Sequence, residues 1–337
     1  MKTHLRYPLW ISWEITNKCN YKCIHCRMDE LNDFNKELST DEVISCINQL
    51  NEIGVYQINY SGGEPFLRND FIDILEYTSK SNIKIGVTTN GSLIDEEIVK
   101  KLKMIKNLDF IQISLDGRDN ATHNHIRGIN GAYETAIETI RMLVNSNFNV
   151  GVVTTVMKPN VKQIPDILNK LTELGVNMFG ARRFMPTGKG NNSADLLAVN
   201  TDEYCSHIHY WVDSINNKDN KVKCIIEEPL LSILRDKLPV SWKFDGCQAG
   251  DQYGAITANG DIRACIFIPV KLGNIKEQNF KSIWETSKIR EKIILRELNG
   301  SCKVCNLIKE CGGCRAAAYL NTGDYLGDDP MCFYKNT

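Results

Sequence analysis

Six short runs of apolar, mostly β-branched residues alternate with longer stretches in which apolar residues recur at helical spacing. The runs lie at 10–16, 54–60, 83–89, 108–115, 149–157 and 176–184. Between the first two runs, Val43, Ile47 and Leu50 recur every three or four positions, as on one face of a helix. Because each crossover between parallel strands needs a helix that covers one face of the sheet, the alternation predicts an α/β fold with a parallel sheet.

The number of strand–helix units limits the topologies that the sheet can have. Six units fit a partial, TIM-like (β/α)6 barrel better than a complete eight-stranded barrel, and a doubly wound open sheet is the competing topology. In both topologies, functional sites form in the loops that follow the carboxyl ends of the strands. We therefore expect one shared rim for the segments at 19, 61–65 ("SGGEP"), 89–91 ("TNG") and 114–117 ("SLDG").

Cysteine is unusually frequent, with 13 residues in 337. The first residues contain no continuous apolar segment of the kind found in a signal peptide, so we expect a cytoplasmic protein. Disulfides are rare in that compartment, and closely spaced thiols there indicate metal ligands. The cysteine clusters therefore predict metal sites.

Cys19, Cys23 and Cys26 form the first cluster, with three and then two residues between them. A structural zinc site takes four ligands, and so does a cubane iron–sulfur cluster. His25 could be a fourth zinc ligand, but it directly precedes Cys26 and would hardly reach the same metal. An iron–sulfur cluster with one open iron is the better interpretation.

The charge balance and the hydropathy exclude two classes of partner. The chain has 40 basic and 41 acidic residues, for a net charge of −1, which gives no basic excess for binding nucleic acid. No apolar run approaches the roughly 20 residues that a membrane-spanning helix needs. We therefore expect neither a nucleic-acid partner nor a membrane span.

Seven further cysteines lie near the C-terminus. They are Cys247, Cys265, Cys302, Cys305, Cys311, Cys314 and Cys332. Two Cys-x2-Cys pairs among them, 302–305 and 311–314, would also be compatible with a zinc ribbon. A total of seven, however, fits neither one nor two closed four-ligand zinc sites.

The spacing Cys-x3-Cys-x2-Cys, followed by "GGEP" after the second strand, resembles the radical SAM superfamily over about residues 10–185. The resemblance implies that Cys19, Cys23 and Cys26 hold a 4Fe–4S cluster whose open iron chelates S-adenosylmethionine. Reductive cleavage of that cofactor would give a 5′-deoxyadenosyl radical, which takes a hydrogen atom from the substrate. The protein would supply orientation and exclude water.

The loop after the second strand has the features of a ligand-binding segment. Its two glycines let the backbone approach a ligand closely, a carboxylate follows them, and a proline stiffens the exit. By the same resemblance this loop would line the methionyl amino group through Ser61, Gly62, Gly63, Glu64 and Pro65, with the carboxylate as the charged member.

The resemblance implies further cofactor contacts from the next two strands. Thr89 and Asn90 would lie near the nucleoside. Ser114 and Asp116 would contact the ribose. Arg127, in "HIRG", would bind the methionyl carboxylate, a role suited to the fixed fork of donors of a guanidinium group.

The order of the C-terminal cysteines resembles the SPASM extension, which carries auxiliary 4Fe–4S clusters in many radical SAM enzymes. Carried over, one auxiliary cluster would be held by Cys302, Cys305, Cys311 and Cys332. The other would be held by Cys247, Cys265 and Cys314. This second set is one ligand short, and the open position could take substrate, water or another residue such as Cys205 or Cys224. The two residues between 311 and 314 depart from the usual three.

These motifs divide the chain into three expected parts. Residues 1–200 would form the radical SAM core, residues 201–245 a helical bridge, and residues 246–337 the auxiliary-cluster domain. Arg182 and Arg183 end the sixth strand. Because neighbours on a strand alternate sides, we expect one of them to face the substrate and the other to face solvent.

The resemblance implies an oxidoreductase but leaves two substrate classes open. The first expectation is a ribosomally made peptide that receives a crosslink, a thioether or an epimerised carbon. The alternative is a tetrapyrrole that is oxidatively decarboxylated or otherwise modified in haem or haem d1 biosynthesis. An external one-electron reductant such as flavodoxin or ferredoxin is implied, and a separate leader-peptide recognition protein could assist. A non-enzymatic iron–sulfur electron carrier is the remaining alternative, although it would need no "GGEP" loop.

Overall fold

A single ten-stranded sheet organises the molecule in the computed structural model, which describes residues 4–28, 36–239 and 246–334. The strand order is β10-β9-β8-β1-β2-β3-β4-β5-β6-β7. The first six strands are all parallel and are β1 (Trp10–Thr16), β2 (Gln57–Gly62), β3 (Lys84–Thr89), β4 (Leu108–Ser114), β5 (Val150–Val156) and β6 (Met178–Arg183). The parallel α/β sheet is confirmed, and each strand lies within one of the six apolar runs or overlaps it.

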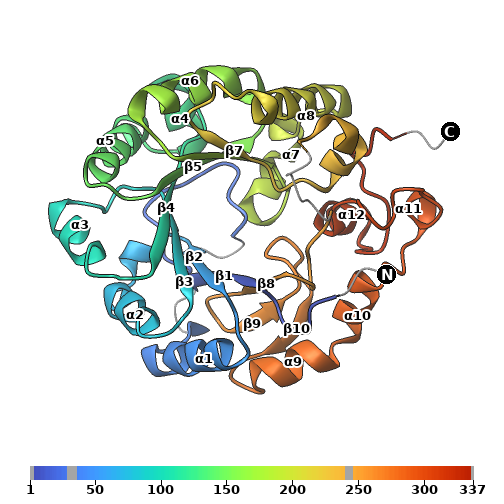
Figure 1. Ribbon diagram of the computed structural model, residues 1–337, viewed down its shortest axis with the longest axis horizontal. Helices are drawn as coiled ribbons and strands as arrows, with labels where there is room; N and C mark the ends of the chain where they lie inside the picture. Colours follow the sequence, from blue (N-terminus) through green and yellow to red (C-terminus); the bar gives the residue numbers. More distant parts are fainter. Residues whose placement is uncertain (1–3, 29–35, 240–245, 335–337) are drawn as a thin grey trace.

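The helices between these strands lie outside the curved sheet (Figure 1). They are α1 (Thr40–Glu52), α2 (Phe71–Thr78), α3 (Glu96–Leu102), α4 (Asn120–Arg127), α5 (Ala132–Asn145) and α6 (Ile164–Leu174), with short 3₁₀ turns at Pro65–Leu67 and Val161–Gln163. Local sequence fixes where they begin. Ser39 caps α1 together with Glu42, and Asp95 and Asp119 accept backbone N–H groups at the starts of α3 and α4. In the described part of the chain, no helix is long and apolar enough to cross a membrane.

The core lies between the sheet and these helices. Buried β-branched and aromatic side chains of the strands, such as Ile11, Ile58 and Ile111, contact one continuous hydrophobic cluster that also includes Val43 and Leu50 of α1. Burying such side chains supplies about 25 cal/mol per Å² of apolar surface, which makes this layer the main source of stability. The partial barrel thus has a packed outer layer, and its inner side is free for a site.

The segment 201–245, which the sequence predicted as a helical bridge, also adds a strand. It contains α8 (Thr201–Asn216), β7 (Lys223–Ile225) and a 3₁₀ helix at Pro229–Lys237. β7 pairs in parallel with β6 and extends the sheet by one strand. Before α8 lie a 3₁₀ turn at Gly188–Ser193 and α7 (Ala194–Leu197). Three residues are too short a run for periodicity to reveal β7.

The C-terminal region joins the opposite edge of the same sheet. β8 (Tyr253–Ile256) pairs in parallel with β1, and β9 (Asp261–Arg263) and β10 (Lys271–Asn274) follow as antiparallel strands. The remaining helices are α9 (Phe280–Thr286), α10 (Lys288–Ile294), α11 (Gly300–Lys303) and α12 (Arg315–Thr322). In Figure 1 these orange and red elements stand beside the open side of the barrel. The boundaries of the three expected parts stay a prediction.

Candidate active site

A cavity at the carboxyl ends of β1–β6 collects most of the residues predicted for the first site. It encloses about 1160 Å³ of space that no atom fills, part of it open to solvent. The predicted residues that line it are Cys19, Cys23, Cys26, Ser61, Gly62, Gly63, Thr89, Asn90, Ser114 and Arg127. The shared rim expected from the sequence is therefore present.

Glu64 lies behind this lining and joins two of its loops. Its Oε1 accepts a hydrogen bond from the Thr89 hydroxyl at 2.7 Å, and its Oε2 accepts one from the Asn90 backbone N–H at 2.8 Å. Burial raises the pKa of Glu64 to about 7. Pro65 is buried beside it. The structure therefore gives Glu64 a positioning role, and its predicted contact with the methionyl amino group stays a prediction.

Asp116 also lies behind the lining, where it holds Arg127. The two side chains are almost completely buried, and Arg127 Nη2 lies 2.6 Å from Asp116 Oδ2. The Thr155 N–H donates to Asp116 Oδ1 at 2.8 Å. Burial alone would raise the pKa of Asp116, but the cation of Arg127, the neighbouring His25 and His123, and the Thr155 N–H together hold that pKa below its usual value. The predicted ribose contact of Asp116 stays a prediction.

Arg127 connects this carboxylate to the first cysteine cluster. Its Nη1 lies 3.8 Å from Cys23 Sγ. His25, which directly precedes Cys26, has its Nε2 at 3.5 Å from Asp116 Oδ2, and burial lowers its pKa to about 4. A neutral imidazole is therefore favoured at this position near pH 7.

The glycine pair after β2 is packed against the chain that leads to Cys19. Gly62 has a φ of +133°, a conformation that favours glycine, and a Cβ on it would clash with the Thr16 carbonyl oxygen. A Cβ on Gly63 would clash with the Lys18 carbonyl oxygen. These contacts explain why the loop contains two glycines and hold it beside the first cysteines.

The chemistry of the three partly buried thiols fits a metal cluster. Burial raises the pKa of Cys19 to about 12, and it also raises the pKa of Cys23 and Cys26. Such thiols become thiolates only with a compensating cation, which a metal supplies. Within the described residues no three Cys, His, Asp or Glu side chains converge as a single metal ion would require. A cubane cluster does not require its cysteine ligands to meet at one metal ion, because each thiolate binds a different iron.

Three further arginines line the cavity, and together with Arg127 they make it basic. Arg27, Arg182 and Arg183 contribute to the lining, whereas none of the described lining residues is Asp or Glu. Arg182 and Arg183 were expected to face opposite sides. Both line the cavity, but they differ in burial, since the Arg182 side chain is 38% exposed and the Arg183 side chain 5%. Sequence reasoning missed Arg27, although its position directly after Cys26 was the available signal.

Each of these arginines has an acidic partner away from the cavity. Arg27 pairs with the buried Glu14, and Arg182 Nη2 lies 3.3 Å from an oxygen of the exposed Glu227. Burial lowers the pKa of Arg27 to about 10, and the like charge of Arg182 contributes to the shift. Carboxylates thus anchor these guanidinium groups, and none of the described residues that line the cavity is Asp or Glu.

Four C-terminal cysteines surround a second, smaller pocket. It encloses about 330 Å³ of unfilled space, and the cysteines that line it are Cys302, Cys305, Cys311 and Cys332. Backbone N–H groups of Leu307 and Gly313 point at two of these sulfurs, at 3.4 and 3.3 Å. The structure therefore brings together the four cysteines that the sequence grouped, and their role as ligands stays a prediction.

The remaining three predicted ligands lie around one small apolar cluster. Cys247, Cys265 and Cys314 all pack against a cluster that includes Ala249 and Ala316. Burial raises the pKa of Cys265 to about 12. The two extra candidates lie elsewhere, since Cys205 is on α8 and Cys224 is buried in the main core on β7. No fourth cysteine belongs to this cluster in the part of the chain that the structure describes.

Comparison with known proteins agrees with this geometry. The family profile of the radical SAM superfamily matches residues 13–171, and that of SPASM, described as an iron-sulfur cluster-binding domain, matches residues 247–315. The chain is 32% identical to an AdoMet-dependent heme synthase of Methanosarcina barkeri, over 97% of each chain. It is 27% identical to the mycofactocin maturase MftC of Mycolicibacterium smegmatis, over 96% of this chain and 82% of the relative.

The fold is also found among solved structures. The crystal structure of Streptococcus suis SuiB bound to the precursor peptide SuiA matches with a TM-score of 0.82 and 21% identity. The match covers 98% of this chain and 77% of SuiB. The partial-barrel architecture with its C-terminal cysteine-rich region is therefore confirmed. Given the full-length relative and both family profiles, the chain belongs to the radical SAM superfamily and carries a SPASM domain, so it is an enzyme that uses S-adenosylmethionine and iron–sulfur clusters for radical chemistry.

Proposed function

We propose that the enzyme oxidatively decarboxylates carboxylate-bearing side chains of a tetrapyrrole. One observation carries this proposal: the cavity is lined by Arg27, Arg127, Arg182 and Arg183, and by no Asp or Glu among the described residues. Guanidinium groups bind carboxylates through two parallel hydrogen bonds. Because Arg127 is assigned to the methionyl carboxylate and Arg183 is held by Asp329, Arg27 and Arg182 are the lining arginines that would meet carboxylates of the substrate.

The relatives support the same choice. The heme synthase of Methanosarcina barkeri matches this chain along almost its whole length at 32% identity, which exceeds the 27% of the mycofactocin maturase. The sequence alone favoured a peptide substrate. The observation that supports a tetrapyrrole, the gathering of distant arginines at one rim, requires the folded chain.

Named residues have distinct parts in the proposal. The first cluster would be held by Cys19, Cys23 and Cys26, and the methionyl carboxylate would meet Arg127. When bound, this cluster and S-adenosylmethionine supply a 5′-deoxyadenosyl radical. The auxiliary clusters would be held by the two cysteine sets near the C-terminus. Glu64 would keep the loops after β2 and β3 together around the cofactor.

The reaction balances for a propionate side chain. One hydrogen atom leaves the methylene next to the macrocycle and becomes part of 5′-deoxyadenosine. The carbon–carbon bond to the carboxylate then breaks, and carbon dioxide leaves together with one electron, so that a vinyl group remains. An acceptor of the iron–sulfur class, which the C-terminal cysteines would hold, would take up the electron. Arg27 and Arg182 would hold the carboxylates of the substrate during this sequence.

A direct assay separates tetrapyrrole from peptide. The anaerobically reconstituted enzyme, with S-adenosylmethionine and a reductant, is incubated with iron coproporphyrin III, and the products are followed by mass spectrometry. We expect loss of carbon dioxide and two hydrogens per reacting side chain. Arg182→Gln should raise KM more than it lowers kcat, whereas Arg118→Gln, which alters an exposed pair with Asp166, should change neither. An unchanged porphyrin would contradict the proposal.

Peptide modification is the second candidate, because the mycofactocin maturase is similar over 96% of this chain. A cysteine-bearing peptide in the same assay would then lose a pair of hydrogens on crosslinking, and a separate leader-peptide recognition protein would be a partner. In both cases we propose an external one-electron reductant such as flavodoxin or ferredoxin. We also propose a cytoplasmic location, because all 13 cysteines are free, as expected in a reducing compartment.

A further inference from the structure

We propose that the buried Arg183–Asp329 pair is a positioning device that ties the active-site cavity to the C-terminal cysteines and sets the reduction potential of the cluster held by Cys247, Cys265 and Cys314. The inference rests on the ligand sets of the proposed function, but it is independent of the substrate. No motif in the sequence connects Arg183 with Asp329, which lies 146 positions further along the chain.

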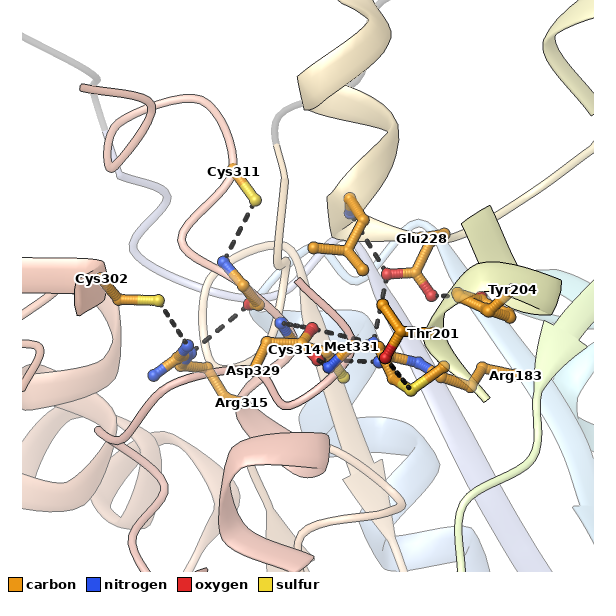
Figure 2. A network of polar contacts seen from close by, with 12 residues as sticks. Arg183, Thr201, Tyr204, Glu228, Cys302, Cys311, Cys314, Arg315, Asp329 and Met331 are labelled. Carbon is orange, nitrogen blue, oxygen red and sulfur yellow. Dashed lines mark hydrogen bonds and ion pairs between the residues drawn. The ribbon is translucent and has the colours of Figure 1, made fainter. Parts of the chain in front are cut away.

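The pair itself is bidentate and excluded from water. Arg183 Nη1 lies 2.8 Å from Asp329 Oδ1, and Nη2 lies 2.9 Å from Oδ2. The side chains are 5% and 0% exposed. Figure 2 shows Arg183 reaching from the end of β6 to Asp329, near the C-terminus of the chain. Two parallel charge-assisted hydrogen bonds fix both the distance and the orientation of the two groups.

Asp329 continues the connection to the cysteines. Its Oδ2 accepts a hydrogen bond from the Cys314 backbone N–H at 2.8 Å, and its Oδ1 accepts one from the Met331 N–H at 3.0 Å. Asp329 also lines the pocket of the other cysteine set, which includes Cys302 and Cys311. One carboxylate therefore contacts the backbone of a predicted ligand in one set and lines the pocket of the other set; Figure 2 shows its contact with Cys314.

Arg183 is held on its other side by a second carboxylate. Its Nη2 lies 3.2 Å from Glu228 Oε1, and the Tyr204 hydroxyl donates to Glu228 Oε2 at 2.6 Å. The guanidinium carbon lies 5.3 Å from the centre of the Tyr204 ring, within the range of a cation–π contact. The guanidinium is thus fixed from three directions, and it still forms part of the cavity wall.

Because these charges are buried near predicted cluster ligands, they should affect the reduction potential of the cluster. Charges buried in protein are screened far less than surface charges. The reduction potential of an iron–sulfur cluster depends on nearby net charge, on hydrogen bonds and on exposure. A cation beside the cluster favours its reduced, more negative form, whereas an anion disfavours it. Arg183 should therefore raise the potential and Asp329 should lower it.

Removing the positive charge of the pair and removing its negative charge should shift the reduction potential in opposite directions, and this can be tested in the full chain. Cys19, Cys23 and Cys26 are first changed to Ala, so that only the auxiliary clusters remain, and potentials are measured by redox titration with electron paramagnetic resonance. We expect Arg183→Gln to lower the potential, Asp329→Asn to raise it, and the double variant to return toward the parent. Arg68→Gln is the matched control, because Arg68 is held by both oxygens of Asp70 in the segment after β2.

The possible results distinguish a failure of the proposed effect on the potential from a failure of the assigned cluster ligands. Iron content is measured for every variant, and if Arg183→Gln fails to load iron, Asp329→Asn carries the same test with the opposite sign. Full iron content with unchanged potentials, or with shifts in the same direction, would overturn the inference. A parent protein without two auxiliary clusters would instead contradict the ligand assignment.

Discussion

The Nη1 of Arg127 lies 3.8 Å from the sulfur of Cys23, although 104 positions separate the two residues. The contact places a permanent cation beside the first cysteine cluster, and the buried Asp116 fixes its orientation. A guanidinium group in this position can meet the carboxylate of S-adenosylmethionine as well as a sulfur ligand. The relationship links the loop after β1 to α4 and leads to the first prediction.

Arg127→Gln should weaken binding of S-adenosylmethionine. Hydrogen bonds to charged groups contribute about 1.5–3 kcal/mol, so we expect the Kd to rise roughly tenfold or more. Isothermal titration on the reconstituted protein measures this, with Arg118→Gln as the surface control. An unchanged Kd would show that the methionyl carboxylate is bound elsewhere.

Glu64 should make stability depend on pH in an unusual direction. Its pKa is about 7 in the folded protein and near 4.5 when unfolded, so the folded state binds more protons between these values. Stability from this residue is therefore present below about pH 4.5 and is lost as the pH rises toward 7, by roughly 3 kcal/mol at most. Denaturant unfolding without added cofactor should show this loss in the parent and not in Glu64→Gln. Parallel pH profiles would contradict the assignment.

The four cysteines around the smaller pocket should hold one cluster of their own. The reconstituted enzyme should contain about twelve irons, because three four-iron clusters are proposed. Changing Cys302 and Cys305 together to Ala should remove about four of them. Iron and zinc are counted by elemental analysis. Unchanged iron together with one bound zinc would show that this pocket is a zinc site.

The part of the site that follows from the order of the parallel strands could be predicted from the sequence. Ser61, Thr89 and Ser114 come from different strands, yet all line one cavity, because the carboxyl ends of parallel strands meet at one edge. The cysteine groupings were also predictable, since spacing and resemblance identify them without knowledge of the fold. Both inferences depend only on order along the chain.

Other features required the folded structure. β8 pairs with β1 although more than 230 positions separate Trp13 from Ile256, and four residues carry little periodicity. Arg183 and Asp329 are 146 positions apart, and nothing local marks either of them as half of a buried pair. Such pairings are set by tertiary packing, which is why the basic lining and the substrate preference that it supports could not be predicted from the sequence.

Cys314→Ala should separate cofactor cleavage from turnover. Cys314 packs against the same apolar cluster as Cys247 and Cys265, it does not line the first cavity, and its N–H donates to Asp329. Production of 5′-deoxyadenosine should therefore remain largely intact, while product formation falls at least about tenfold because the electron from the substrate lacks its acceptor. Both are measured in one assay by liquid chromatography. Turnover at the parent rate would mean that this cysteine set has only a structural role.

The central claim is that the loop with Cys19, Cys23 and Cys26 holds the cluster that cleaves S-adenosylmethionine. The most direct measurement is the amount of 5′-deoxyadenosine that Cys26→Ala forms under anaerobic, reducing conditions. Cys205→Ala on α8 is the matched control, since it removes a cysteine outside the cavity lining. We predict that Cys26→Ala forms none above background, because two cysteines cannot hold the open cluster, while Cys205→Ala cleaves the cofactor at the parent rate. Cleavage by Cys26→Ala at the parent rate would contradict the account.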